Sequence, residues 1–218
     1  MSRAHSKRTG RRPGASDTRE QIAVAARTQF AELGYERATF RGIAAATGVD
    51  PALVVHFYGS KEDLFREVMQ LPPAVSEALV RIADGPREQM GTRLAELVIA
   101  ALENPATRPV VLGRIRSASS HPDAAALVRE TVTRDLSALT SAITDDQPDT
   151  RAVLVGAQVV GIALARYVVH VEPLASLPTA EVIELIAPTF QRYLTGPLTT
   201  SGRPAVKESR RRRASTRQ

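Results

Sequence analysis

The side chains near the N-terminus that could do chemistry are cations and hydrogen-bonding groups. Arg11 and Arg12 precede the first predicted helix, Arg41 lies inside a short second one, and His56 lies in a third. Lys61 stands in the first turn of a fourth helix, whose positive N-terminus also attracts phosphate. Lysine and arginine neutralise phosphate charge, and imidazole can donate to a phosphate or a base edge. These residue types favour contact with a polyanion over covalent catalysis.

Motifs of the common catalytic classes are absent from the sequence. It contains no cysteine, which excludes disulfides, thiolate metal sites and cysteine nucleophiles. The four histidines are scattered and form no H-E-x-x-H pair, and the segment Gly59-Ser60-Lys61 lacks the earlier glycine of a phosphate-binding loop. We therefore expect a protein that is not an enzyme and that uses no metal and no cofactor.

Residues 39–65 predict two short helices joined by a tight turn at Gly48, with a further helix after them. Glycine supplies the positive φ of such a turn, and serine, threonine and aspartate are preferred helix caps. The caps are Thr39, Asp50 and Ser60, and Pro51 occupies the first position of the middle helix. This is the pattern of a helix-turn-helix, whose second helix enters the major groove of DNA.

An upstream helix is expected to support this pair. Ser16 or Asp17 can cap it, and Gly34 is expected to end it by adopting a left-handed conformation. Between them, apolar residues recur at helical spacing and form one stripe. The stripe consists of Ile22, Ala26, Phe30 and Leu33.

The helix that would read DNA has few polar groups. Its inward side is expected to carry Val49, Val54 and Tyr58, and its outward side Ala52, Leu53 and His56. On the outward side, the apolar residues can contact thymine methyl groups, and the imidazole can donate to phosphate or a base edge. The alternatives are that Leu53 simply packs and that His56 is only an exposed imidazole.

The segment from about residue 12 to residue 68 resembles the DNA-binding domain of the tetracycline-repressor (TetR) family. It carries a first helix ending in F-A-E-L-G-Y, then T-x-R-x-I-A-x-x-T-G-V-D, then the closing block H-F-Y-G-S-K-E-D-L-F. The resemblance implies an all-α fold. In it, a three-helix DNA-binding domain with a helix-turn-helix is followed by a helical ligand-binding and dimerisation domain.

The resemblance also assigns candidate DNA contacts. Thr39 and Arg41 are similar to the family's backbone-positioning residues. Two positions depart from the family's pattern. Val55 stands where the family usually has a tyrosine that contacts phosphate, and Phe57 precedes Tyr58 in the reverse of the commoner order. Which of the two rings is buried stays open, so Tyr58 is kept among the candidate contacts.

Positive charge is concentrated at the two ends of the chain. Residues 1–16 carry five basic residues and no acid, and residues 196–218 carry seven basic residues and one acid, so the middle has a net charge of −5 within a total of +6. Such ends predict disordered arms that meet phosphate, or else solubilising tails. The expected organisation is an arm at 1–15, a DNA-binding domain at 16–70, a ligand-binding and dimerisation domain at 71–195 and a tail at 196–218.

The rest of the chain predicts helices separated by proline and glycine breaks, without strands. From about 148 to 171 it is apolar on nearly every face, but its longest apolar run has fourteen residues, short of the roughly 20 that span a bilayer. We therefore expect no membrane insertion. This helix and one at 179–194 would instead pack against a second copy to form a homodimer, the alternative being a monomeric core.

A ligand pocket in the second domain is implied by the resemblance. Polar side chains set among apolar helices are candidates to line it: Arg114, Arg116, His121, Arg166, Tyr167 and His170. The basic N-terminus lacks the apolar stretch of a signal peptide, which favours a cytoplasmic protein.

The leading hypothesis is a nucleoid-associated bacterial regulator, usually a repressor, that binds a palindromic operator as a dimer. A small-molecule effector would release it from the double-stranded DNA. One alternative is a sequence-nonspecific DNA-binding or DNA-processing protein that uses the same helix-turn-helix. Another is a helical bundle that binds a small molecule and has incidental basic tails.

Overall fold

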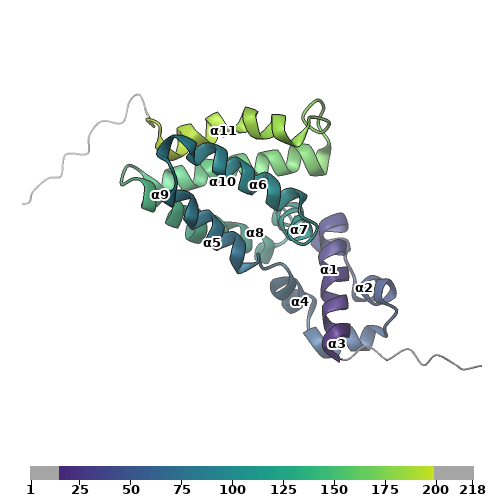
Figure 1. Cartoon of the computed structure of the whole chain (residues 1–218). Helices are drawn as coiled ribbons and strands as arrows, with labels where there is room; N and C mark the ends of the chain where they lie inside the picture. Colours follow the sequence, from purple (N-terminus) through teal and green to yellow (C-terminus); the bar gives the residue numbers. More distant parts are fainter. Residues whose placement is uncertain (1–14, 199–218) are drawn as a thin grey trace, which may run out of the picture.

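The computed structural model describes residues 15–198. Its N-terminal part is a small bundle of helices (Figure 1). It consists of α1 (Ala15–Arg37), α2 (Phe40–Thr47), α3 (Pro51–Tyr58) and α4 (Lys61–Val68). The long α1 packs against α2 and α4, and α2 packs against α3. The expected helix-turn-helix is therefore formed by α2 and α3.

Each short helix begins at the cap that the sequence predicts. Thr39 and Ser60 each accept a hydrogen bond from the backbone N–H three residues later, at 3.1 and 3.0 Å, and Asp50 accepts one from two residues later, at 2.7 Å. Such a cap contributes about 1 kcal/mol to stability. Gly48 ends α2 with a φ of 68°, which is the left-handed conformation that the turn requires.

Helix α1 is kinked at Gly34, where the sequence predicts its end. The glycine has φ 76° and ψ 173°, after which a short helical turn leads to Arg37. The backbone N–H of Tyr35 donates to the Ser117 hydroxyl at 2.9 Å, and this hydrogen bond is buried. This hydrogen bond joins the end of α1, just after the kink, to the helix Arg108–Ala118.

Aromatic rings form the centre of the N-terminal core. Phe30 and Phe65 are fully buried and meet edge to face, with ring centroids 4.8 Å apart. The Tyr35 ring lies 5.2 Å from Phe65. Ala124 and Leu127, from the C-terminal part of the chain, complete the same core. The N-terminal bundle is therefore closed on one side by the helices that follow it.

The chain after α4 is helical, and residues 15–198 contain no strand, so the all-α prediction is confirmed. Its elements are α5 (Pro73–Val80), 3-10 turns at Arg81–Asp84 and Arg87–Gln89, α6 (Met90–Glu103), α7 (Arg108–Ala118), α8 (Pro122–Glu130), a π-helical segment at Thr131–Leu136, α9 (Ser137–Ile143), α10 (Pro148–Leu164), a second π-helical segment at Ala165–Val169, and α11 (Thr179–Thr195).

The π-helical segments interrupt two stretches for which the sequence predicts continuous helices. The first, Thr131–Leu136, lies against α10 at Gly156, where a Cβ would come within 2.8 Å of a Val132 methyl group. The second segment ends at His170, which has a φ of 58°. The close contact with Gly156 involves residues far apart in the chain, so apolar periodicity along the sequence does not predict the first segment.

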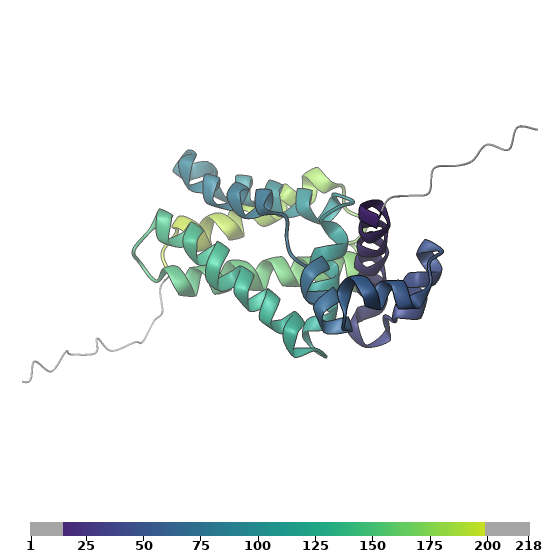
Figure 2. The ribbon, with the colours of Figure 1, turned by 90° about the horizontal axis from the view of Figure 1, so that it is seen from below.

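Helix α11 packs against both α6 and α10 at the end of the molecule remote from α2 and α3 (Figures 1 and 2). Helix α7 lies at the junction and packs against both α1 and α8. Residues such as Leu94, Leu139 and Phe190 are fully buried and form a second core, separate from the aromatic one. The molecule thus has two cores that meet along α7 and α8.

The stretch Pro148–Val169, which is α10 with its π-helical extension, is the one helix within residues 15–198 that is long and apolar enough to cross a membrane. The helix has 22 residues, and an 18-residue window within it has a mean hydropathy of 1.9, so the apolar stretch is longer than the fourteen-residue run suggests. The core helix of a soluble protein can be equally long and apolar, so length and composition do not establish a membrane span. In the single chain 33% of that 18-residue window is buried, which leaves apolar side chains of α10 exposed.

Candidate nucleic-acid interface and ligand cavity

The candidate DNA-reading surface is the exposed side of α3. Ala52, Val55 and His56 are exposed and Leu53 is half-buried, while Val54 is in the core, as the sequence predicts. The surface offers one imidazole and otherwise apolar groups. Such a surface suits contact with thymine methyl groups better than extensive hydrogen bonding to base edges.

Tyr58 lies inside the bundle. Its hydroxyl donates to the backbone carbonyl of Arg19 at 2.8 Å, and the Arg19 guanidinium lies over its ring, 5.4 Å from the centroid. Burial raises the pKa of Tyr58, so the phenol keeps its proton. Because the ring is buried and the hydroxyl is occupied, Tyr58 fits the role of holding α3 to α1 better than direct contact with DNA.

The flanks of the reading helix carry exposed groups that suit phosphate. Thr39 and Arg41 are both exposed, and within residues 15–198 the Arg41 guanidinium has no hydrogen-bond or ion-pair partner. Arg41 is therefore available to an anion. Arg11 and Arg12 lie outside the described residues, and their contact with DNA remains a prediction.

Lys61 has intramolecular partners. Its Nζ donates to the backbone carbonyl of Glu36 at 3.2 Å and lies 4.4 Å from the centroid of the Tyr35 ring. These contacts hold the start of α4 against the end of α1. The ammonium has three N–H groups and the Glu36 carbonyl takes one of them, so Nζ keeps donors for the predicted phosphate contact.

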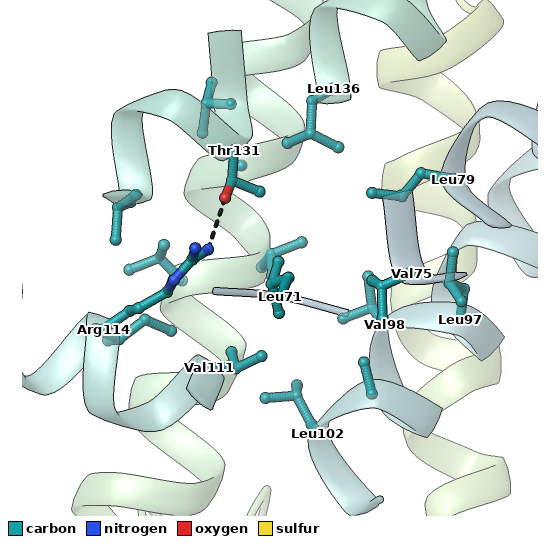
Figure 3. A pocket seen from close by; sticks show the side chains of 17 residues that line it. Leu71, Val75, Leu79, Leu97, Val98, Leu102, Val111, Arg114, Thr131 and Leu136 are labelled. Atoms are coloured by element: carbon teal, nitrogen blue, oxygen red, sulfur yellow. Dashed lines mark hydrogen bonds between the residues drawn. The ribbon is translucent and has the colours of Figure 1, made fainter. Parts of the chain in front are cut away.

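A cavity of about 120 Å³, the space open to the centres of water-sized molecules, lies between helices of the C-terminal part (Figure 3). Its walls come from α5, α6, α7, α8, the first π-helical segment and α10. They are almost entirely apolar, and Arg114 and Thr131 supply the polar side chains. The remaining lining residues are Leu71, Val75, Leu79, Leu97, Val98, Ala101, Leu102, Val111, Ile115, Val128, Val132, Leu136, Gly156, Val159 and Val160.

Arg114 is buried and connects the cavity to the N-terminal bundle. Its Nε donates to the backbone carbonyl of Met69, just after α4, at 2.6 Å, and Nη1 donates to the Thr131 hydroxyl at 2.8 Å. Desolvation lowers the pKa of Arg114 to about 10, so the side chain remains a cation at neutral pH. The cavity therefore contains a positive charge on an otherwise apolar wall.

Of the six polar residues that the sequence nominates as pocket lining, Arg114 lines this cavity and the other five do not. Arg116 packs beside Gly34, and His121 lies against the Tyr35 ring in a tilted arrangement, with ring centroids 3.5 Å apart.

The rest of the nominated set is grouped near the end of α10. Arg166 donates to the backbone carbonyls of Leu174 and Leu177. The Tyr167 hydroxyl donates a hydrogen bond to the Glu103 carboxylate at 3.1 Å, and His170 is exposed in the loop that follows. The apolar walls were missed because no spacing in the sequence distinguishes them from ordinary core.

A helix-turn-helix bundle joined to a helical domain with an apolar cavity defines a DNA-binding regulator of the ligand-responsive type. Family models match both parts of the chain. Residues 22–68 match "Bacterial regulatory proteins, tetR family", and residues 88–194 match "Tetracyclin repressor-like, C-terminal domain". The chain belongs to the TetR family of transcriptional regulators.

Individual relatives agree with this assignment. A TetR-family regulator from Streptomyces coelicolor is 38% identical in a structural match that covers 85% of this chain and 99% of that one, with a TM-score of 0.57. The repressor AcnR from Corynebacterium glutamicum is 37% identical over 76 residues, which is 32% of this chain and 40% of AcnR. The chain thus matches less than half the length of this curated relative.

A third comparison concerns the fold alone. A protein from Saccharomonospora viridis, solved in complex with choline, is 18% identical, with 81% of this chain and 96% of that chain covered and a TM-score of 0.60. The arrangement of helices is therefore shared well beyond recognisable sequence similarity.

Proposed function

We propose that this protein is a homodimeric repressor that binds a palindromic operator and releases it when a small molecule enters the cavity. The observation that carries the proposal is the direct hydrogen bond from cavity-lining Arg114 to the Met69 carbonyl at the end of α4. One side chain thus belongs to both the ligand cavity and the DNA-binding bundle. The repressor AcnR and the choline complex are consistent with this role.

On the DNA, α3 would lie in the major groove with Ala52, Leu53 and His56 towards the bases. Thr39 and Arg41 would contact the DNA backbone, and Lys61 would join them through the ammonium protons that the Glu36 carbonyl does not use. Because α3 exposes few hydrogen-bonding groups, DNA shape and the arm that carries Arg11 and Arg12 would contribute to specificity.

Dimerisation would use an exposed apolar stripe along α10. Val153, Ala157, Gly161 and Leu164 are all exposed at helical spacing, and a Cβ at Gly161 would meet nothing within 4 Å. Leu185 of α11 is 59% exposed. A second copy would cover these surfaces and place two α3 helices about 34–36 Å apart, one turn of DNA.

The route from cavity to DNA would pass through the junction between α7 and α4. Next to Arg114, a Cβ at Gly113 would lie 3.1 Å from the Met69 side chain, and Met69 is fully buried. Leu71 of the following linker lines the cavity itself. A ligand that displaces α7 would therefore move the end of α4 and change the spacing of the two reading helices.

Footprinting of genomic DNA fragments tests the proposal, with the DNA upstream of the protein's own reading frame included. We expect one discrete, roughly palindromic protected site. Uniform protection without a preferred site would instead favour the alternative of a sequence-nonspecific DNA-binding protein. Such a regulator would work in the bacterial cytoplasm, in contact with the nucleoid.

A further inference from the structure

We propose that the cavity takes a small ligand with one anionic group, best represented by a carboxylate, and an apolar body. The inference rests on the proposed function, because it treats the cavity as the effector site. The carboxylate would pair with Arg114, and the apolar body would extend to the opposite wall (Figure 3).

Arg114 differs from the other buried arginines in lacking a carboxylate partner. Within residues 15–198, three arginine side chains are buried. Arg151 pairs with Asp146 at 2.6 Å, and Arg166 lies 3.8 Å from Glu103. No described carboxylate lies within 4 Å of the Arg114 guanidinium, whose two partners, a carbonyl and a hydroxyl, are neutral. An unpaired buried charge is costly, and an anion in the cavity would remove that cost.

The acidic residues nearest to Arg114 are engaged elsewhere. Asp135 accepts hydrogen bonds from Arg134 Nε at 2.9 Å and from the Ser76 hydroxyl at 3.0 Å. Glu130 pairs with Arg134 Nη1 at 2.6 Å. Desolvation lowers the pKa of Arg114, and the negative charges of Glu130 and Asp135 raise it and so partly oppose this effect. Neither carboxylate forms a direct ion pair with Arg114, so the position of a directly paired counter-ion is left to a ligand.

The guanidinium retains the donors that a carboxylate needs. Arginine has five N–H groups, and the two hydrogen bonds of Arg114 use one on Nε and one on Nη1. The second Nη1 proton and both Nη2 protons have no partner among the described residues. A carboxylate can accept from Nη1 and Nη2 together in the bidentate arrangement that arginine favours. The bond to Met69 can persist in this arrangement.

The wall opposite Arg114 restricts the polarity of the rest of the ligand. Leu79, Leu97 and Val98 lie across the cavity from Arg114 (Figure 3). A second charge placed there would be desolvated without a partner. A cation such as choline would also meet the positive charge of Arg114. The walls therefore select an apolar body with a single anionic end.

Two acids and their neutral amides, octanoate with octanamide and 4-phenylbutyrate with 4-phenylbutanamide, provide the test. Calorimetric titration of the full chain should show at least one acid binding about 10- to 100-fold more tightly than its amide, as expected for a charge-assisted hydrogen bond. Octylamine should bind more weakly than either octyl compound. Acids that bind no more tightly than their amides would overturn the inference, and this comparison requires no variant.

A substitution then tests whether Arg114 causes the tighter binding of the acid. R114Q should bind the octanoate and octanamide pair with equal affinity, and R151Q is the control because Arg151 lies outside the cavity and should leave the acid preference unchanged. Thermal unfolding of each variant reports folding. A preference for the acid that survives in folded R114Q would contradict the assignment of Arg114.

Failure of the ligand inference is separable from failure of the proposed function. If a discrete footprint is found but the acids show no preference over the amides, only the ligand class is wrong. If the acid preference is found but no preferred DNA site exists, the ligand class stands and the repressor proposal fails.

Discussion

The DNA-binding bundle and the cavity domain differ in how they handle positive charge. In the bundle, the candidate DNA contacts Arg41 and His56 lie on the surface, where a large polyanion can reach them, and the interior is aromatic. In the cavity domain, Arg114, Arg151 and Arg166 are buried. One region thus offers cations to a partner outside the molecule. The other buries its cations, two of them against carboxylates and backbone carbonyls and one, Arg114, on the wall of the cavity.

The two regions also differ in the range of the interactions that build them. In the bundle, Thr39, Asp50 and Ser60 each cap a helix through a backbone group two or three residues away. The cavity draws its walls from residues as far apart as Leu71 and Val160. Local interactions therefore specify the reading helix, whereas long-range packing specifies the ligand site.

The largest expected effects come from removing the central ring of each core. F30A and F190A should each lower the free energy of unfolding by about 3–5 kcal/mol, because both rings are fully buried. If the two cores are separate, F30A should mainly lower hydrogen-exchange protection in α1–α4, and F190A mainly in α6 and α11. Equal loss of protection throughout the molecule in both variants would show one cooperative core.

A charge on the α10 stripe should have the next largest effect. V153E would bury an unpaired carboxylate in the proposed interface and raise the dimer dissociation constant by about 100-fold or more. V24E is the matched control, because Val24 on α1 is 52% exposed and Val153 is 58% exposed. Light scattering measures the mass of each variant. A dimer of undiminished stability in V153E would place the interface elsewhere.

The helix-turn-helix was predictable in detail because its signals are local. Gly48, Pro51 and the three caps each impose one conformation, so the bounds of α2 and α3 follow from them. Side-chain partners were not predictable to the same degree. The contact of Lys61 with the Glu36 carbonyl depends on the direction that the chain takes after the kink in α1.

The cavity was predictable only as a consequence of family resemblance. Among the nominated polar residues, Arg114 lines it, whereas Arg166 binds backbone carbonyls in the loop before α11. Both are arginines in apolar helices, and the sequence does not distinguish them. Their roles differ because the first π-helical segment and the linker after α4 bring Thr131 and Met69 to Arg114.

Removing the charge of Lys61 should reduce DNA affinity for all sequences by a small amount. K61A is expected to lower the slope of log affinity against log salt concentration by about one unit, as the loss of one phosphate contact predicts. R87A is the control, because Arg87 lies in a 3-10 turn outside the bundle. Titrations at several salt concentrations give the slopes. An unchanged slope in K61A would leave Lys61 with only its intramolecular role.

The smallest expected effect is on the fall in melting temperature at acid pH, and it involves one aspartate in each region. Hydrogen bonding by Ser60 lowers the pKa of Asp63, and hydrogen bonding by Arg151 lowers that of Asp146. A lowered pKa in the folded state stabilises the protein above the unfolded value, near 3.9, and this stabilisation is lost as the pH falls through the folded pKa. D63N and D146N should each show a smaller fall in melting temperature between pH 6 and pH 3. A fall equal to that of the unsubstituted protein would contradict the assigned linkage.

The most direct test of the central claim, that locally specified α3 reads DNA as part of a dimer, is the ratio of two affinities. Fluorescence anisotropy at one salt concentration would compare the footprinted duplex with a scrambled duplex of the same length and composition. We expect the footprinted site to bind at least about 10³-fold more tightly, with two protomers per duplex. Equal affinity for the two duplexes would contradict the account.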